Sequence, residues 1–496
     1  MRRILVLLLL GLLSMPLLAQ AGVGSAAVDT WYVRPTGACA NNGDGRSYGC
    51  AAGAGAAGAF RTFANIIWTA TTGVDDGDTL FVCGAHLTML RVGGGGAVNA
   101  PLTIRGDCPS DHGTINTSSA VNNLTDAIQL ENKPWVTLRN FDLLTGERHG
   151  ILLYNHSGAP LLGLSVLNNT LDNRLASSAT NGCYEIFAHS NVAADTFASL
   201  TITGNTLLGT PTGCGSGINH GIAIQRPTND VLVNFNTVYD TKGDSITLAG
   251  ASGSNILVAG NRLNNGLYGG IKIQHAGFGC VNGVQLIANV IINNQSWGIL
   301  LLDASTSLVA QNTIIGFHDG PQDQSPPTLS ALIIKQYNGC AQVNNTFLNN
   351  IFTGDYDAGL VVNYDTARAS FEANNTWNGN VFYQRGSQTV LMGFLTDTGN
   401  NVTVSNVGTW ITSHPLDFST VPTFLNSAAC TSEATVAGCK ASDWRLTASS
   451  SLHRAGAPFA ACTDARGRVC QNPPDIGAYQ QFDYTVPAVP TGLIIH

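Results

Sequence analysis

Three basic side chains in the middle of the chain follow short apolar segments and could together abstract a proton from an acidic sugar. Arg226 follows Gly221–Gln225, and Lys272 and His275 lie in the segment that begins at Gly270. Removing the proton next to a sugar carboxylate requires a base and a cation that neutralises the carboxylate. Lys272 or His275 can supply the base, and Arg226 can hold the carboxylate in its planar fork. These residues favour a polysaccharide lyase that acts by β-elimination on a uronate-containing polysaccharide.

Two carboxylates offer a second chemistry. Hydrolysis of a glycosidic bond uses a pair of carboxyl groups, and Asp244 and Asp303 are the candidates. Two repeat units would separate their backbones by ~10 Å, so a glycoside hydrolase is the second hypothesis. The third is a non-catalytic glycan-binding surface protein or adhesin. In that interpretation Lys272 is a solvated strand residue, and the two carboxylates belong to turns.

Further polar residues are expected on the same face. Tyr337 or Tyr364 could donate a proton to the leaving oxygen, whereas His220 and His149 have an alternative interpretation in which they only cap turns. The residues predicted to contact the ligand are Gln225, Gln274, Lys335, Tyr337, Tyr364 and His220.

The elements that position these residues follow from an internal repeat. An Asn followed two residues later by an apolar residue recurs at intervals of 23 to 38 residues, with a looser copy at Asn140. Asn tolerates the left-handed backbone conformation and bonds to backbone in turns. We therefore expect one Asn turn in each rung of a solenoid, with the amides stacked in a ladder. The repeated residues are Asn169, Asn205, Asn236, Asn261, Asn289, Asn312, Asn350 and Asn380.

A second motif alternates with the first. It is a small residue followed by apolar residues, as in Gly150-Ile151-Leu152-Leu153, and Cys183-Tyr184-Glu185-Ile186 is a degraded copy. Because successive strand residues face opposite sides, the first apolar residue of each copy should point into the core. The predicted inward stack is Ile151, Ile222, Ile246, Ile271, Ile299, Leu332 and Leu360.

These two motifs predict an all-β parallel β-helix with three strands per rung. Ala249 and Gly250 should leave a hollow between Arg226 and His275. The intervals 173–183, 207–219 and 315–330 are insertions at one turn of the rung, so they should wall one side of the face. The last insertion is also expected to cover the outward residues Leu300 and Ile333.

The chain divides into four parts. Residues 1–21 have two Arg, an apolar run and Ala19-Gln20-Ala21, the pattern of a signal peptide. Residues 22–110 should form the N-terminal cap and first rungs, including a short capping helix at Phe63–Trp68. Residues 111–384 are the repeats, and 385–496 form a disulfide-containing cap and tail that closes the other end.

Composition limits the partners and the compartment. The formal net charge is −8 with no basic run, which disfavours nucleic acid. No later apolar run is long enough to span a membrane, so the mature chain is expected to be secreted or periplasmic, and a monomer. Twelve Cys with no C-x-x-C pattern favour disulfides over zinc. The expected pairs are Cys39–Cys50, Cys83–Cys108, Cys183–Cys214, Cys280–Cys340, Cys430–Cys439 and Cys462–Cys470.

Both ends of the chain resemble secreted bacterial right-handed parallel β-helix proteins of the pectin-lyase-like superfamily. The N-terminal resemblance lies in Tyr32–Gly37, Phe60–Phe63 and Asp76–Val82, and the C-terminal one in Asp443–Leu446, Asp464–Arg468 and Asp475–Gln480, similar to a D-I-G-A-Y closing motif. The resemblance implies a right-handed solenoid and secretion, in a group of mostly polysaccharide lyases, glycoside hydrolases and uronan epimerases.

The catalytic signatures of that group are incomplete here. Asn219-His220-Gly221 and Gly270-Ile271-Lys272 are similar to polygalacturonase motifs, but the preceding Asp pair is missing and Gly270 replaces an Arg. The epimerase D-P-H triplet is absent from the sequence. Calcium pectate lyases carry several Asp on adjacent rungs, and two Asp are too few to support a calcium site. No metal or other cofactor is therefore expected, and no specific activity follows from the resemblance.

Overall fold

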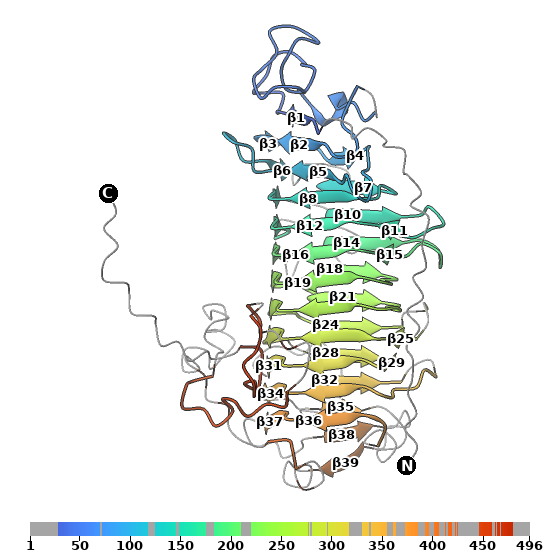
Figure 1. The fold of residues 1–496 in the computed structure, drawn as a ribbon, viewed down its shortest axis with the longest axis vertical. Coiled ribbons are helices and arrows are strands. Elements are labelled where there is room, and N and C mark those ends of the chain that lie inside the picture. Colours follow the sequence, from blue (N-terminus) through green and yellow to red (C-terminus); the bar gives the residue numbers. More distant parts are fainter. Residues whose placement is uncertain are drawn as a thin grey trace, which may run out of the picture.

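A computed structural model shows an elongated stack of rungs (Figure 1). It describes residues 28–479 with gaps. The gaps longer than five residues are 118–124, 175–182, 210–219, 317–329, 355–360, 364–372, 385–391, 406–411 and 425–445. The proposed signal peptide therefore lies outside the described residues. Among the residues described, no helix is long and apolar enough to cross a membrane.

Each complete rung contributes one strand to each of three long sheets, which we call A, B and C in chain order and which are parallel except for the last strand of sheet C. Sheet A consists of β1 (Thr30–Val33), β2 (Thr79–Val82), β5 (Leu102–Arg105), β8 (Val136–Arg139), β12 (Ser165–Leu167), β16 (Thr201–Thr203), β19 (Val231–Asn234), β22 (Ile256–Ala259), β26 (Val284–Ile287), β30 (Leu308–Ala310), β33 (Thr346–Leu348) and β36 (Thr376–Asn378). Sheet B consists of β3 (Ala85–His86), β6 (Thr114–Asn116), β9 (Asp142–Leu144), β13 (Thr170–Asp172), β17 (Thr206–Leu208), β20 (Thr237–Tyr239), β23 (Arg262–Asn264), β27 (Val290–Ile292), β31 (Thr313–Gly316), β34 (Ile351–Gly354) and β37 (Val381–Gln384).

Sheet C carries the segments in which the candidate site residues were predicted. It consists of β4 (Leu90–Val92), β7 (Ile128–Glu131), β10 (His149–Asn155), β14 (Tyr184–Ser190), β18 (His220–Gln225), β21 (Ile246–Ala249), β24 (Gly269–Gln274), β28 (Trp297–Leu302), β32 (Ser330–Lys335), β35 (Val361–Asn363), β38 (Met392–Leu395) and β39 (Asn401–Ser405). Two short pairs, β11 (Leu161–Leu162) with β15 (Phe197–Ala198) and β25 (Val281–Asn282) with β29 (Ala304–Ser305), lie between sheets C and A.

The corner between sheets A and B is a buried asparagine ladder, as the repeat predicts. The Oδ1 atom of Asn261 accepts bonds from the backbone N–H and the amide of Asn236, both at 3.0 Å. Its own Nδ2 donates to Val233 O in its neighbouring rung and to Asn289 Oδ1, each at 2.9 Å. The same pattern continues along the stack to Asn380, which bonds to Asp417 at the end of the ladder. Each amide therefore satisfies buried backbone groups of its neighbours.

The left-handed residue of this corner is not the ladder asparagine but the residue before it. Gly204 and Gly260 adopt positive φ there, and so do Asn168 and Phe235 (φ 53°). Asn140 was read as a loose copy of the ladder residue, which is wrong by one position. Asn140 has φ 57°, and it is the N–H of Phe141 that donates to Asn169 Oδ1.

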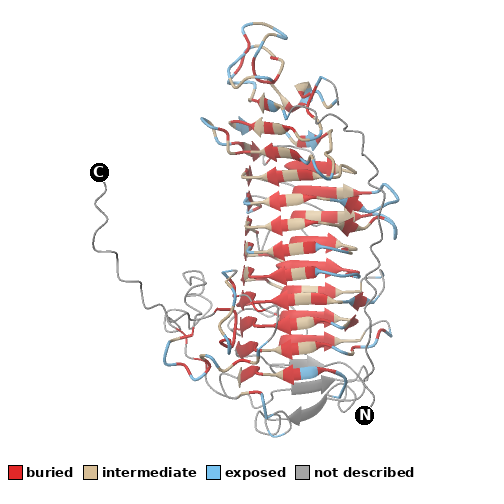
Figure 2. Ribbon diagram, in the orientation of Figure 1, coloured by how far each residue is buried: buried red, intermediate tan, exposed pale blue. Residues whose placement is uncertain are grey.

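The inward stack of sheet C is confirmed for six of its seven predicted members. Ile151, Ile222, Ile246, Ile271, Ile299 and Leu332 are all fully buried in one core cluster, and Figure 2 shows the strands of the stack largely as buried residues. The seventh position belongs to Val361, which pairs with Leu332, whereas Leu360 lies outside the described residues. In the degraded copy Cys183–Ile186 the predicted alignment is wrong by two positions. Ile186 pairs with Ile151, so Glu185 and not Cys183 takes the place of the small residue.

The two ends differ from the expected caps. The predicted helix at Phe63–Trp68 is a single 3₁₀ turn, η1 (Phe63–Asn65), after which the backbone becomes extended at Ile66. Phe63 stacks on His86 with ring centroids 4.2 Å apart, and Trp68 packs against the core cluster. A cap helix is therefore not formed, although the apolar side chains of the segment still contribute to the core.

The C-terminal region does not simply close the other end. β38 and β39 lie at that end of sheet C, but the segment around Asp475–Tyr479 folds back along the side of the stack (Figure 1). Gly477 N–H donates to Asn349 O at 2.8 Å, and Ala478 N–H donates to Thr313 Oγ1 at 2.9 Å. The reason is apolar burial, because a second core cluster joins this segment to outward residues of the rungs: Ile287, Val290, Ile292, Ile315, Ile351 and Val381 with Leu446, Leu452, Ile476, Ala478 and Tyr479.

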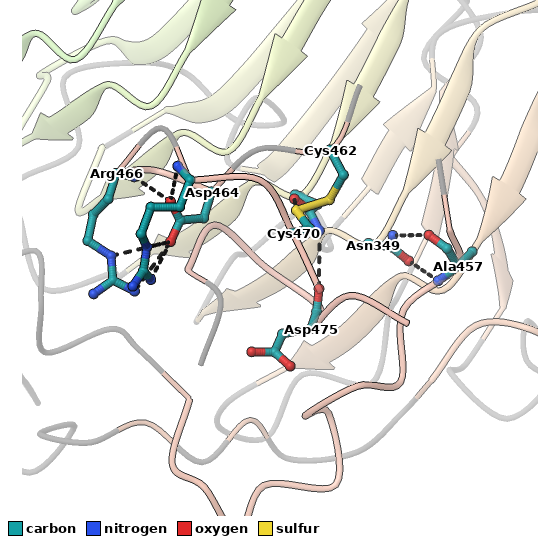
Figure 3. Close-up of a disulfide and its surroundings, with 9 residues drawn as sticks. Asn349, Ala457, Cys462, Asp464, Arg466, Cys470 and Asp475 are labelled. Atoms are coloured by element: carbon teal, nitrogen blue, oxygen red, sulfur yellow. Dashed lines mark hydrogen bonds and ion pairs between the residues drawn. A yellow bond between two sulfur atoms is a disulfide. The ribbon is translucent and has the colours of Figure 1, made fainter. Parts of the chain in front are cut away.

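Four predicted disulfides are confirmed: Cys39–Cys50, Cys83–Cys108, Cys280–Cys340 and Cys462–Cys470. Cys183 is also disulfide-bonded, but its predicted partner Cys214 and the pair Cys430–Cys439 lie outside the described residues. Figure 3 shows the Cys462–Cys470 bridge beside the Asp464–Arg466 pair and the reciprocal bonds of Asn349 with Ala457. Disulfides of this number are consistent with an oxidising compartment.

Candidate functional site

The outward residues of sheet C form three columns that run along the solenoid. The register of neighbouring strands places equivalent residues side by side, about 4.8 Å apart. The edge column is Asp126, His149, Tyr184, His220, Asp244, Gly269, Trp297 and Ser330. The central column is Arg91, Gln129, Leu152, Phe187, Ala223, Thr247, Lys272, Leu300 and Ile333, and the turn-side column is Glu131, Tyr154, His189, Gln225, Ala249, Gln274, Leu302 and Lys335.

Stacked rings occupy the edge column. His149 lies 5.2 Å from Tyr184, and Tyr184 lies 5.3 Å from His220 with the two rings nearly parallel. Phe187 of the central column stacks on Tyr184 at 4.2 Å, and Tyr154 stacks on His189 at 5.2 Å. Flat, partly polar side chains of this kind offer apolar faces together with hydrogen-bonding edges.

Backbone hydrogen bonds fix the tautomer of two of these histidines. The N–H of Tyr184 donates to His149 Nδ1 at 3.2 Å, and the N–H of Asp244 donates to His220 Nδ1 at 3.0 Å. An accepting Nδ1 leaves the proton of the neutral ring on Nε2. Burial lowers the pKa of both histidines below the ordinary range; at His220 Asp244 opposes this and Lys272 adds to it. Both rings therefore present a neutral Nε2–H donor.

Next to His220 lies a compact charged cluster. Asp244 Oδ2 accepts a bond from Thr247 Oγ1 at 3.1 Å and lies 3.5 Å from His220 Nδ1 and 4.0 Å from Lys272 Nζ. Asp244 is 1% exposed, and its Oδ1 has no hydrogen-bond partner among the described residues. A buried carboxylate with one unused oxygen is costly unless a cation or donor is near, so Lys272 is held beside it.

Trp297 closes the next position of the edge column. A Cβ on Gly269 would meet the indole at 1.9 Å, so glycine is required for the indole to lie there. The ring centre is 5.8 Å from Lys272 Nζ, a distance at which an ammonium is attracted by the ring face. Trp297 therefore bounds the Asp244–Lys272 cluster on one side, and His220 bounds it on the other.

A pocket of about 340 Å³ lies on the same face nearer the N-terminal end. It is lined by Gln129, Leu152 and Phe187 of the central column and by Tyr154 and His189 of the turn-side column. His149 of the edge column and Arg148 complete the lining. Arg148 is held by a two-pronged bond to the buried Asp126, with Nε–Oδ1 at 2.8 Å and Nη2–Oδ2 at 2.7 Å. The sequence predicted neither this pocket nor its arginine.

The predicted cationic group does not converge. Lys272 lies in the central column, but Arg226 and His275 lie in the turn that follows the strands, one on each side of Gly250. Arg226 Nη1 donates to Ser190 Oγ at 2.5 Å, and His275 Nδ1 accepts from Gly277 N–H at 3.0 Å. Ala249 and Gly250, which lie between the two side chains, are both buried.

The predicted pair of carboxylates is also separated. Asp303 is fully buried in a turn with φ 54°, four residues beyond Ile299, whereas Asp244 precedes Ile246 by two. That offset of six residues corresponds to about 20 Å along the strand direction. It exceeds the spacing of paired glycosidase carboxylates, which reaches about 9.5 Å.

The other predicted residues have mixed positions. His220 is in the edge column, whereas Gln225, Gln274 and Lys335 lie half-buried in the turn-side column. Tyr337 and Tyr364 lie outside the described residues, as do most of the three insertions. In chain order the insertions all fall between a strand of sheet B and the next strand of sheet C. Leu300 and Ile333 are buried as expected, but residues 317–329, predicted to cover them, are not described.

The edge column has a signal in the sequence. Five strands of sheet C, β10, β18, β24, β28 and β32, begin one residue before the small residue of the motif, as in His149-Gly150 and His220-Gly221. The residue before the small one points outward in these strands. Trp297 could have been found in this way, whereas Tyr184 follows Cys183, the residue that the sequence alignment takes as the small one. Among the described residues, no group of three or more His, Cys, Asp or Glu could hold a metal ion.

Comparison with known proteins supports the architecture. Residues 126–315 match the family model of the right-handed β-helix region, which gives the handedness of the described stack. Among curated proteins, none matches this sequence.

Several solved structures are similar at low identity. A lacto-N-biosidase of Eubacterium ramulus is 14% identical over 72% of this chain and 64% of its own, with a TM-score of 0.47. The A-module of a mannuronan C-5 epimerase from Azotobacter vinelandii is 15% identical over 73% of this chain and 92% of its own, with a TM-score of 0.34. A pectate lyase is 11% identical over 92% of this chain and 98% of its own, also at 0.34. The chain thus spans less than two thirds of the lacto-N-biosidase, and none of these likenesses identifies an activity.

Proposed function

We propose that this right-handed β-helix is a secreted carbohydrate-active protein that binds a uronate-containing polysaccharide along the outer face of sheet C and cleaves it by β-elimination. The observation that carries the proposal is the Asp244–Lys272 pair beside His220, on a face lined by stacked rings. A polymer running parallel to the solenoid axis would cross several rungs, and it would contact several members of each column.

In this proposal Lys272 is the base. Its amine takes the proton next to the uronate carboxylate, a C=C double bond forms in the ring, and the adjacent glycosidic C–O bond breaks. Asp244 and Trp297 hold the lysine side chain between them, 4.0 Å from Asp244 Oδ2 and 5.8 Å from the indole centre. Positioning of a base in this way is the protein's contribution to general base catalysis.

His220 supplies a neutral donor. Its Nε2–H can hold the substrate carboxylate as negative charge spreads onto it, or give a proton to the leaving oxygen. The backbone N–H of Asp244 fixes the ring through Nδ1, so the donor does not need to reorient during the reaction. Tyr184, stacked on the same ring, lies next in the column and can donate from its hydroxyl.

A panel of galacturonan, glucuronan and mannuronan–guluronan polymers tests the proposal. The expected product is an unsaturated chain end, detected by ultraviolet absorbance, with a rate that rises toward alkaline pH because the base must be the neutral amine. New reducing ends without ultraviolet absorbance would instead indicate a hydrolase. Binding without any cleavage would support the glycan-binding protein, which the ring-lined face also suits.

A further inference from the structure

We propose that the pocket lined by Arg148, His149, Tyr154 and His189 is a separate binding site for an anionic sugar unit, such as a hexuronate. The inference rests on the proposed function only in that the outer face of sheet C binds a polysaccharide. It adds a site that is remote from the reacting bond, and it names the ligand chemistry that this site selects.

The pocket is built from hydrogen-bond donors. Asp126 neutralises Arg148 from behind through Nε and Nη2, and Nη1 has no hydrogen-bond partner among the described residues. His149 presents Nε2–H because Tyr184 N–H occupies its Nδ1. Gln129 uses Oε1 to accept two bonds from Arg91, at 3.2 and 3.0 Å, which leaves its amide N–H groups as donors.

Apolar and aromatic side chains form the rest of the pocket. Phe187 and Leu152 form an apolar floor on which the C–H face of a sugar ring can lie, and Tyr154 and His189 stand on the turn side. None of the seven lining residues is an Asp or a Glu. A pocket with an arginine, several N–H donors and no carboxylate in its lining fits a carboxylate or sulfate carried on a sugar ring.

The arginine is preorganised for this role. Asp126 is fully buried, and the side chain of Arg148 is 22% exposed, so the guanidinium is fixed in a plane with one edge turned to the pocket. Burial is the largest influence on the Asp126 carboxyl and raises its pKa, while the bonds from Arg148 oppose that effect. Removing Arg148 alone would leave Asp126 buried without its partner, so the test must remove both charges together.

The site is separate from the reacting cluster. His149 and Asp244 belong to the same edge column with Tyr184 and His220 between them, which places their backbones about 14 Å apart at one rung per step. A ligand that fills both positions must therefore be an oligosaccharide. Loss of the pocket should weaken binding of such a chain without altering the chemistry at Lys272.

The test measures binding by calorimetry in the double variant Asp126→Asn/Arg148→Gln. The ligands are an oligouronate, its carboxyl-reduced neutral analogue and a sulfated oligosaccharide of equal length. The proposal expects the oligouronate to bind about 10- to 100-fold more weakly to the variant, as for loss of a charged hydrogen bond. The neutral analogue should bind weakly and equally to both proteins. If only the sulfated ligand bound more weakly to the variant, the pocket would still be an anion site, and the group that it recognises would be sulfate.

The matched control is Asp107→Asn/Arg105→Gln, which neutralises a similar two-pronged pair at the end of β5 on sheet A, and it should leave affinity unchanged. Equal binding of every anionic ligand by wild type and the Asp126/Arg148 variant would overturn the pocket and leave the proposed function standing. Failure of wild type to bind any acidic glycan would instead remove the proposed function. Melting temperatures of both double variants show whether the fold is intact.

Discussion

The corner between sheets A and B and the outer face of sheet C are built on the same rungs and have opposite chemistry. In the corner, the Asn261 amide is fully buried and bonds to its neighbours on both sides. On sheet C, His220 keeps an Nε2–H donor, and Lys272 lies beside Asp244 with its side chain partly exposed. Uniform residues in one column and varied residues in another therefore separate what holds the solenoid together from what it can bind.

Sheets B and C also differ in what covers their outer faces. Outward apolar residues of sheet B, such as Val290 and Ile315, are buried beneath Ile476 and Tyr479 of the C-terminal segment. The ring-lined part of sheet C retains a pocket of about 340 Å³. Buried apolar contacts stabilise the covered side, whereas the open side keeps its hydrogen-bonding capacity for a ligand.

The largest expected effect is on the open face. Lys272→Ala should reduce turnover of a uronan by roughly 10²–10⁴-fold, the usual contribution of a general base. The melting temperature should also fall, because the buried Asp244 carboxylate loses the cation beside it, so turnover is measured at a temperature at which the variant is folded. Initial rates and thermal melts measure the two effects. Arg262→Ala, which removes a positive charge from β23 of sheet B, is the control and should retain full activity.

In the asparagine corner a substitution should lower stability and leave turnover unchanged. Asn261→Ala removes four hydrogen bonds and leaves buried polar groups without partners, which costs about 3–5 kcal/mol in the free energy of unfolding. Denaturant titration measures this loss, and the variant that remains folded should keep its turnover per active molecule. Asn191→Ala, at an exposed turn, is the control. If Asn261→Ala were as stable as Asn191→Ala, the ladder would not contribute to stability.

The covering of sheet B should matter less. Ile476 is fully buried against the side of the stack, so Ile476→Ala should cost about 2–3 kcal/mol of unfolding free energy. Val469→Ala, at an exposed residue of the same C-terminal segment, should cost almost nothing. A loss of glycan binding in Ile476→Ala at a temperature where it is fully folded would contradict the division between the two sides.

The smallest expected effect is a pH dependence of stability from the face histidines. Burial lowers the pKa of His220 in the folded state, so the unfolded chain binds more protons as pH falls below ~6.5. Stability should therefore decrease on acidification, and His220→Gln should reduce that slope. Urea midpoints at neutral and mildly acidic pH measure it. His112→Gln, at a largely exposed histidine, controls for loss of an imidazole; a slope unchanged in His220→Gln would refute the assignment.

Prediction from the sequence succeeded where the signal repeats and failed where it does not. The ladder and six inward residues were found because an amide or an aliphatic side chain is required at the same place in every rung. Arg226 and His275 were placed with Lys272 because they directly follow strands of the same sheet, whereas Lys272 lies within its strand and the two others lie in the turn beyond. Asp126–Arg148 had no periodic signal, since Arg148 occurs in one rung alone.

The sequence by itself determined the structure of the repeating rung. Strand alternation and buried asparagines are local requirements, and they set the three-stranded period and the inward stack before any long-range contact is known. Only the tertiary structure decided which outward side chains meet, because neighbours such as His220 and Asp244 are 24 residues apart in the chain and loops of unequal length separate the rungs. The same holds for the D-I-G-A-Y segment, since which apolar strip it covers depends on how the chain folds back.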